Sequence, residues 1–315
     1  MTRSTGRRTA REEWAADCVA DSAGGITFDV MGAARPDAVL VLRRRPDGAP
    51  AADDVRLPLT GAGGRRLRAV LPSTVELPEG HWDVRTGARG ERPVRLGVRD
   101  ARALVGRTPG AGRVIARVPY VTAEGTLAVR SWVRAPHAEV GEVRCARGTV
   151  TVEGTLYGAE LGREAAVEAR PRGGGETYRA PVTGGGGGFA FTLPYARLAA
   201  GPGEAGQWWD LWLLPAPGGP AVRVARILDD VWDRRGSALR LPFPAEGRRA
   251  APYYTEDNGL SVRLEPAPAP APASASAPAP MTAPAPAPEP APAPAPVVVS
   301  SASVVARRSG APCGP

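Results

Sequence analysis

Three tryptophans on one short segment are the side chains in this sequence best suited to contact a ligand. Trp208, Trp209 and Trp212 lie close together, and Asp210 stands between them. Strand alternation would put Trp209 on one face of a strand and Trp208, Asp210 and Trp212 on the other. Exposed indoles stack on pyranose rings, and a carboxylate accepts hydrogen bonds from sugar hydroxyls. Two interpretations stay open: a sugar-binding surface formed by Trp208, Asp210 and Trp212, or a face covered by a neighbouring domain.

No segment of the sequence predicts a catalytic or metal centre. Residues 229–233 read Asp-Asp-Val-Trp-Asp, a pattern that binds a magnesium diphosphate in prenyl-transferring enzymes, but those enzymes use two such clusters on long helices. The glycine run 184–188 lacks the lysine of a phosphate loop and precedes a strand-like segment rather than a helix. The local sequence around His81 and His137 predicts no carboxylate to orient either ring for nucleophilic catalysis. We therefore predict no catalytic residues, no metal and no cofactor.

The composition narrows the chemistry and the compartment. All 40 basic residues are arginines, which excludes lysine-based catalysis and points to a GC-rich bacterial genome. The first residues are charged and lack the apolar core of a secretion signal, and no apolar run is long enough to cross a membrane. The three cysteines are too scattered for a zinc site or a disulfide framework: Cys18, Cys145 and Cys313. We expect a cytoplasmic protein without a transmembrane segment, and leave peripheral contact with the inner face of the membrane open.

The positive charge is concentrated in the first part of the chain. Residues 1–147 carry 25 arginines against 17 acidic residues, which accounts for the whole net charge of +8, whereas residues 148–266 carry 13 against 14. Such a surplus can face an anionic polymer or lipid headgroups, or it can simply keep the protein soluble.

The sequence contains an internal repeat. Residues 119–130 and 252–263 align without gaps and are identical at six of twelve positions. Three further pairs keep the same order along the chain: Leu71-Pro72 with Leu193-Pro194, Trp82-Asp83 with Trp209-Asp210, and Val94-Arg95 with Val222-Arg223. We predict two homologous units, and we expect Trp82 and Trp209 to occupy equivalent core positions.

Within each unit the hydrophobic residues alternate as they do in strands. Residues 67–71 and 189–193 are examples, and turn residues such as Asn258-Gly259 separate the runs. Helix is expected only in short pieces, over 11–19 and 229–234. Strands at this spacing predict an all-β fold of two tandem antiparallel, immunoglobulin-like β-sandwiches, followed by a disordered Ala-Pro tail. The predicted ranges are a basic N-terminal segment (1–23), the first sandwich (24–134), a joint (135–147), the second sandwich (148–266) and the Pro/Ala-rich tail (267–315).

Part of the chain resembles a known class of wall-polymer module. The resemblance rests on Trp209-Asp210-Leu211-Trp212-Leu213, on residues 222–231 and on Pro252-Tyr253-Tyr254-Thr255. These segments are similar to the β-rich accessory modules of actinobacterial glycosyltransferases and CDP-glycerol glycerophosphotransferases. The likeness covers mainly 148–266 and, more weakly, the first repeat. Those enzymes hold catalysis in a separate nucleotide-sugar domain, and this sequence lacks its βαβ alternation and glycine-rich turn.

The resemblance implies a non-catalytic accessory or binding protein associated with synthesis of a teichoic-acid-like cell-wall glycopolymer. Its partner would be that anionic glycopolymer or a wall-polymer transferase, and no nucleic acid is predicted. Two alternatives stay open. The chain could itself be a glycosyl or glycerophosphoryl transferase of the same pathway, or it could be a structural scaffold whose proline-rich tail recruits partners. Whether it is an enzyme is left open, with binding favoured.

Overall fold

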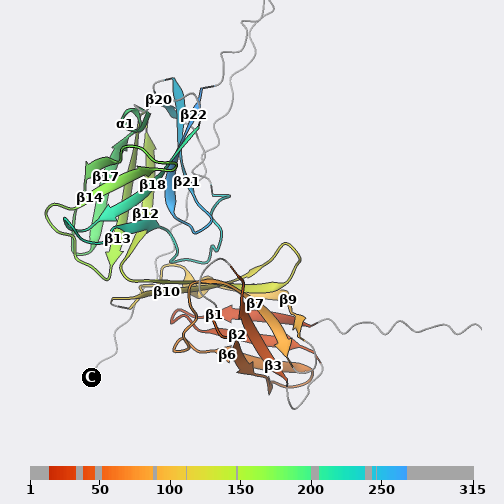
Figure 1. Cartoon of the computed structure of the whole chain (residues 1–315). Coiled ribbons are helices and arrows are strands. Elements are labelled where there is room, and N and C mark those ends of the chain that lie inside the picture. Colours follow the sequence, from red (N-terminus) through yellow and green to blue (C-terminus); the bar gives the residue numbers. More distant parts are fainter. Residues whose placement is uncertain are drawn as a thin grey trace, which may run out of the picture. The chain divides into compact units, whose positions relative to one another are not determined.

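The computed structural model describes residues 14–32, 38–46, 52–87, 91–110, 112–146, 148–199, 206–237, 243–245 and 247–267. All of these ranges belong to one compact unit. The predicted Ala-Pro tail and most of the predicted basic N-terminal segment lie outside the described residues. The fold is nearly all β, as the alternation predicts (Figure 1). Within the described ranges, helix is limited to α1 (Tyr195–Ala199) and a 3-10 turn at Arg102–Leu104.

Strands β1 to β11, called here the first half, form two sheets. Five strands pair in the following order: β5 (Thr60–Gly61), β6 (Arg66–Leu71), β2 (Ile26–Met31), β1 (Ala15–Ala20) and β9 (Arg95–Asp100). The other sheet runs β10 (Val114–Val121), β11 (Leu127–Arg134), β7 (Gly80–Gly87), β3 (Val39–Arg44) and β4 (Val55–Pro58), and β8 (Arg92–Pro93) also pairs with β7.

Strands β12 to β22, called here the second half, form one curled sheet of eleven strands. Its main path is β16 (Thr183–Gly185), β17 (Gly188–Pro194), β13 (Thr149–Tyr157), β12 (His137–Ala146), β19 (Val222–Ala225), β18 (Gln207–Leu214), β22 (Leu260–Pro266), β21 (Arg248–Tyr254) and β20 (Phe243–Ala245). One edge of β18 pairs with β19 and β22. Its other edge pairs with β14 (Ala166–Pro171), which in turn pairs with β15 (Tyr178–Pro181).

The two halves pair their strands in the same order. The series β5-β6-β2-β1-β9 matches β16-β17-β13-β12-β19, and β10-β11-β7-β3-β4 matches β21-β22-β18-β14-β15. The register matches as well. In the first half Val129 lies between Pro119 and Trp82 on the neighbouring strands. In the second half Val262 lies between Pro252 and Trp209 in the same way. Most pairings are antiparallel, but β1 pairs with β9 and β12 with β19 in parallel, which the alternation pattern does not reveal.

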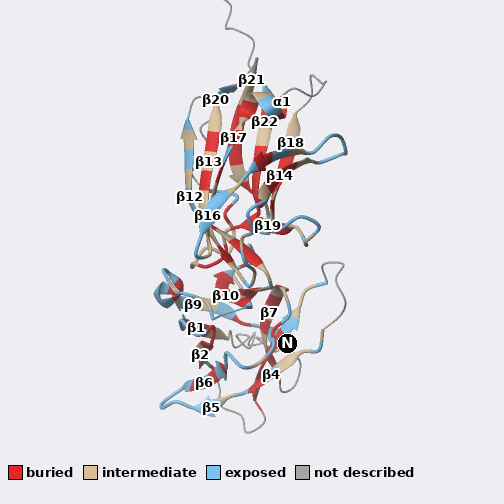
Figure 2. Ribbon diagram, turned by 90° about the vertical axis from the view of Figure 1, so that its left-hand side faces the viewer, coloured by how far each residue is buried: buried red, intermediate tan, exposed pale blue. Residues whose placement is uncertain are grey.

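Each half has its own hydrophobic core, formed by the inward-facing residue of each alternation. In β6 every second residue is buried, and Figure 2 shows the same banding along other strands. Trp82 is fully buried in the first core, and Trp209 is 7% exposed in the second. The expectation that both tryptophans are core residues is confirmed. The first core also includes Ile227 and Leu228, which follow β19 of the second half.

Two sequence expectations for helix are wrong. Residues 15–20 form β1, in which Ala16, Cys18 and Ala20 are buried on one side, so their small apolar side chains follow a period of two. Residues 229–234 form bends and no helix, because Asp229 and Asp233 bind the backbone N–H groups two residues ahead. Strands β1 and β12 also lie in ranges predicted as the N-terminal segment and the joint.

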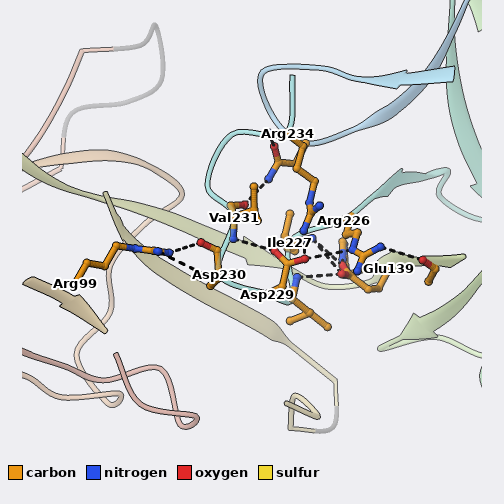
Figure 3. A network of polar contacts seen from close by, with 12 residues as sticks. Arg99, Glu139, Arg226, Ile227, Asp229, Asp230, Val231 and Arg234 are labelled. Atoms are coloured by element: carbon orange, nitrogen blue, oxygen red, sulfur yellow. Dashed lines mark hydrogen bonds and ion pairs between the residues drawn. The ribbon is translucent and has the colours of Figure 1, made fainter. Parts of the chain in front are cut away.

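A polar network connects the segment after β19 to both halves (Figure 3). The Glu139 carboxylate accepts hydrogen bonds from the backbone N–H groups of Ile227 and Leu228, at 3.0 Å each, and contacts His137 Nε2 at 2.7 Å. Arg99 of the first half donates to the Asp230 carbonyl and forms an ion pair with its carboxylate at 3.5 Å. These contacts fix the residues that complete the first core.

Candidate functional site

The outward face of β18 carries the predicted ligand-binding side chains. Trp209, Leu211 and Leu213 point into the core, whereas Trp208 is 43% exposed and Asp210 and Trp212 are half-buried. The alternation expected for this strand is therefore correct, and the structure brings Trp208, Asp210 and Trp212 to one face. The alternative interpretation, in which a neighbouring domain covers this face, requires a buried Trp208. Within the described residues the Trp208 ring stays exposed.

The Asp210 carboxylate is already engaged by its neighbours. It accepts hydrogen bonds from Arg172 at 2.6 and 3.0 Å, from Arg223 at 3.0 Å and from the Ser261 hydroxyl at 2.7 Å. Burial acts to raise the pKa of Asp210, but the hydrogen bonds from Arg172 and Ser261 and the charge of Arg223 outweigh it and hold the pKa below its usual range. Asp210 is thus an ionised anchor for two guanidinium groups.

Trp212 is flanked by cations. The guanidinium carbon of Arg170 lies 4.9 Å from the centre of its ring system, and that of Arg223 lies 5.6 Å away. Both distances are within the range of cation–π attraction. Burial, opposed by the charge of Asp210, lowers the pKa of Arg223 to about 10, so the group still carries its charge at neutral pH. Trp212 therefore supports arginines on this face and offers less open ring surface than Trp208.

Trp208 borders a pocket where β14 ends and β18 begins. The pocket has a volume of about 680 Å³, and its lining combines aromatic, cationic and glycine residues. The lining residues are Pro171, Arg172, Gly174, Gly175, Glu176, Thr177, Tyr178, Arg197, Gly206, Gln207, Trp208 and Trp209. Arg197 of α1 places its guanidinium 5.6 Å from the Tyr178 ring. Glu176 is the single carboxylate in this lining.

Sequence reasoning missed the arginines of this site. Arg170 shares a face of β14 with Glu168, and the register of β14 with β18 places Arg170 directly opposite Asp210, while Arg172 follows the last residue of β14. The internal repeat could have indicated Arg172, because Arg45 pairs with Asp83 in the first half as Arg172 pairs with Asp210. Arg197 has no comparable signal, since α1 comes near Trp208 only through the tertiary fold.

The histidines occupy structural positions. His81 Nδ1 is 2.7 Å from the Tyr120 hydroxyl, and burial together with Arg130 and Arg45 lowers the pKa of His81. Contrary to the sequence expectation, His137 does have a carboxylate partner: it is fully buried, with its Nε2 2.7 Å from the Glu139 carboxylate. Across the described ranges, no three histidine, cysteine or acidic side chains are grouped so that they could hold a metal ion. The same ranges contain no helix of the length and apolarity needed to span a bilayer.

Comparisons with known proteins find no family and only distant structural likeness. No known protein family matches the sequence, and no curated protein is significantly similar to it. Among solved structures, S. aureus TarS is similar with a TM-score of 0.28 and 12% identity, over 58% of this chain and 35% of that one. TarS 217-571 gives 0.27 and 14%, over 59% and 56%. Pullulanase from Anoxybacillus sp. LM18-11 gives 0.22 and 12%, over 63% and 24%. The chain spans about a third of the first TarS chain, and likeness at these scores carries no functional argument.

Proposed function

We propose that this protein is a non-catalytic accessory module that binds a teichoic-acid-like cell-wall glycopolymer at the Trp208 pocket. The observation that carries the proposal is the exposed Trp208 ring at a pocket of about 680 Å³ that also holds Arg172 and Arg197. The volume falls in the usual range for small-molecule sites, about 300–1,000 Å³.

The side chains at the pocket fit a polymer that alternates sugar or polyol units with phosphates. An indole stacks on the apolar face of a sugar ring, and guanidinium groups bind phosphate oxygens through two parallel hydrogen bonds. Arg197 is exposed, and Arg172 is held in place by Asp210 and remains 42% exposed. Within this proposal Asp210 positions Arg172, and Trp212 positions Arg170 and Arg223, so Trp208 is the ring that contacts the ligand.

The proposal extends to the architecture and the setting. The matched strand order supports two homologous, immunoglobulin-like sandwiches as the origin of the two halves. The resemblance to actinobacterial accessory modules supports a cytoplasmic protein near the inner face of the membrane, working beside a wall-polymer transferase. The proposal rests on the pocket and not on the likeness to TarS.

Calorimetric titration with purified poly(glycerol phosphate) at low ionic strength tests the binding function. We expect binding that weakens with added salt, because charges on the surface are screened over about 8 Å at physiological ionic strength. Trp208→Ala and Arg197→Ala should each weaken it. Arg179→Ala is the matched control, since its side chain is 64% exposed and outside the pocket lining. Absence of heat at low salt, or equal losses in all three variants, would refute the pocket as the site.

The transferase alternative is tested separately. Purified protein is incubated with CDP-glycerol and with nucleotide sugars, and donor turnover is measured for the natural sequence and for Glu176→Gln. We expect no turnover in either, because the described strands form no βαβ unit of the kind that binds a nucleotide donor. Turnover that disappears in Glu176→Gln would replace the binding proposal with a catalytic one.

A further inference from the structure

The outer faces of the two halves carry the same polar cluster at matched positions. In the first half Tyr120 lies opposite Ala128, which lies opposite Asp83, and Asp83 forms an ion pair with Arg45 at 2.5 Å. In the second half Tyr253 lies opposite Ser261, which lies opposite Asp210, and Asp210 forms an ion pair with Arg172 at 2.6 Å. Arg45 and Arg172 even donate their backbone N–H groups to matched carbonyls, those of His81 and Trp208. Arg130 and Arg263 are matched too, since they lie opposite His81 and Trp208.

The cluster of the first half is covered by groups from the second half. The Trp232 ring stacks on Tyr120 with 3.9 Å between ring centres and 21° between planes. The Asp257 carboxylate accepts a hydrogen bond from Arg130 at 2.7 Å. As a result Tyr120 is 2% exposed and the Arg130 side chain 4% exposed. One aromatic ring and one carboxylate thus close this face.

The matching cluster of the second half is open in the described part of the chain. Tyr253 is half-buried, and the Arg172 guanidinium lies 5.9 Å from the centre of its ring. Within the described ranges no aromatic ring stacks on Tyr253 as Trp232 stacks on Tyr120. The Arg263 side chain is 39% exposed, and its ion pair is with Glu265 of its own strand at 3.2 Å. Trp208 beside it is exposed, where the first half has His81 under Trp232.

The open face also has a surplus of positive charge. Each of its three carboxylates is shared by two arginines: Glu168 by Arg170 and Arg179, Asp210 by Arg172 and Arg223, and Glu265 by Arg249 and Arg263. A ligand that brings negative charge is therefore favoured electrostatically over a neutral one.

We propose that the outer face formed by β14, β18, β22 and β21 docks a protein partner whose loop supplies an aromatic ring to Tyr253 and a carboxylate to Arg263. This loop would repeat what Trp232 and Asp257 do for the first half. The partner class is an acidic, aromatic loop of another protein domain. Arg172 belongs to both the pocket and the cluster, but the proposal does not depend on glycopolymer binding, because Tyr253 and Arg263 lie outside the pocket lining.

The test uses a labelled pentapeptide, Asp-Asp-Val-Trp-Asp, which copies residues 229–233 and carries one indole and three aspartate side chains. Its binding to the full chain is measured by fluorescence polarisation at low salt. The control peptide has alanine in place of tryptophan. We expect binding of the first peptide, weaker binding of the control, and a loss of affinity with added salt.

Variants locate the peptide on the surface. Tyr253→Leu should weaken binding by about two- to tenfold, the worth of one aromatic pair, whereas Tyr253→Phe should retain it. Arg263→Glu should weaken it further, and Arg197→Ala should leave it unchanged. Each variant is checked for folding by circular dichroism.

Three outcomes would overturn the docking proposal. The first is absence of peptide binding. The second is a loss of affinity in Tyr120→Leu in place of Tyr253→Leu, because the peptide would then be replacing Trp232 on the first half. The third is binding of poly(glycerol phosphate) that depends on Arg263 while the peptide does not bind, which would assign the face to the polymer. Loss of polymer binding in Arg197→Ala alone bears only on the pocket, so failures of the two proposals are distinguishable.

Discussion

Replacing the two core tryptophans tests the packing of both halves with one pair of side chains. Trp82 is fully buried and Trp209 is 7% exposed, so truncation of either to alanine removes a large ring from a packed interior. We expect each change to lower the free energy of unfolding by about 3–5 kcal/mol. Substitution to phenylalanine should distinguish the two positions, because their indole N–H groups differ in hydrogen bonding. Trp82 Nε1 donates to the Pro78 carbonyl at 3.0 Å, whereas Trp209 Nε1 is buried without a hydrogen-bond partner in the described chain.

The phenylalanine variants should therefore differ in a predictable direction. Trp82→Phe loses a hydrogen bond, and Trp209→Phe removes an unsatisfied buried donor, so Trp82→Phe should be more destabilising by about 1–3 kcal/mol. Urea unfolding followed by far-ultraviolet circular dichroism measures these differences. Trp208→Ala is the control and should change stability by less than about 0.5 kcal/mol, since its ring is on the surface. An unchanged midpoint for Trp209→Ala, or a more costly Trp209→Phe than Trp82→Phe, would show that the packing described for these tryptophans is wrong.

Three further predictions concern charge and protonation. Burial and the charges of Arg130 and Arg45 lower the pKa of His81, so protonation of His81 opposes the folded state. The free energy of unfolding should therefore fall as the pH drops below about 6.5. The substitution His81→Gln should flatten this dependence in urea titrations at pH 5 and 7. Burial raises the pKa of Cys18 to about 12, with a smaller opposing effect of Arg99; iodoacetamide at pH 9 should leave Cys18 unlabelled in the folded chain and label it in urea, as peptide mass mapping would show. Asp229 forms ion pairs with Arg226 and with Arg234, whose side chain is 9% exposed. Asp229→Asn should lower the free energy of unfolding by about 3 kcal/mol, because it leaves a buried cation without its charge partner. Asp233→Asn should lower it by less than about 1 kcal/mol in the same urea assay, since its partner Arg235 is 54% exposed.

The fold class and the alternation of β18 could be predicted because they depend on local periodicity. The turn at Asn258 is another local success, since its φ of 56° is the conformation that Asn and Gly tolerate, and the matched Gly125 has a φ of 78°. The helix predicted over 11–19 failed because pairing of β1 with β2 and β9 overrode local propensity. The engagement of Asp210 by Arg172 and Arg223 depends on contacts between strands distant in sequence. No single strand contains that information.

Because Ile227 and Leu228 belong to the first core, that core can be completed only after the ribosome has made most of the second half. Before Ile227, the last aliphatic residue of the first core in the sequence is Val129, about 100 residues earlier. At about 5–20 residues per second, a ribosome needs roughly 5–20 s to make that stretch. The emerging first half must wait that long for its last apolar side chains, with the surface they cover open to solvent. Maturation of the earlier-made sheets is therefore coupled to translation of the later ones, and a nascent chain arrested before Ile227 should be more sensitive to protease than one released at full length.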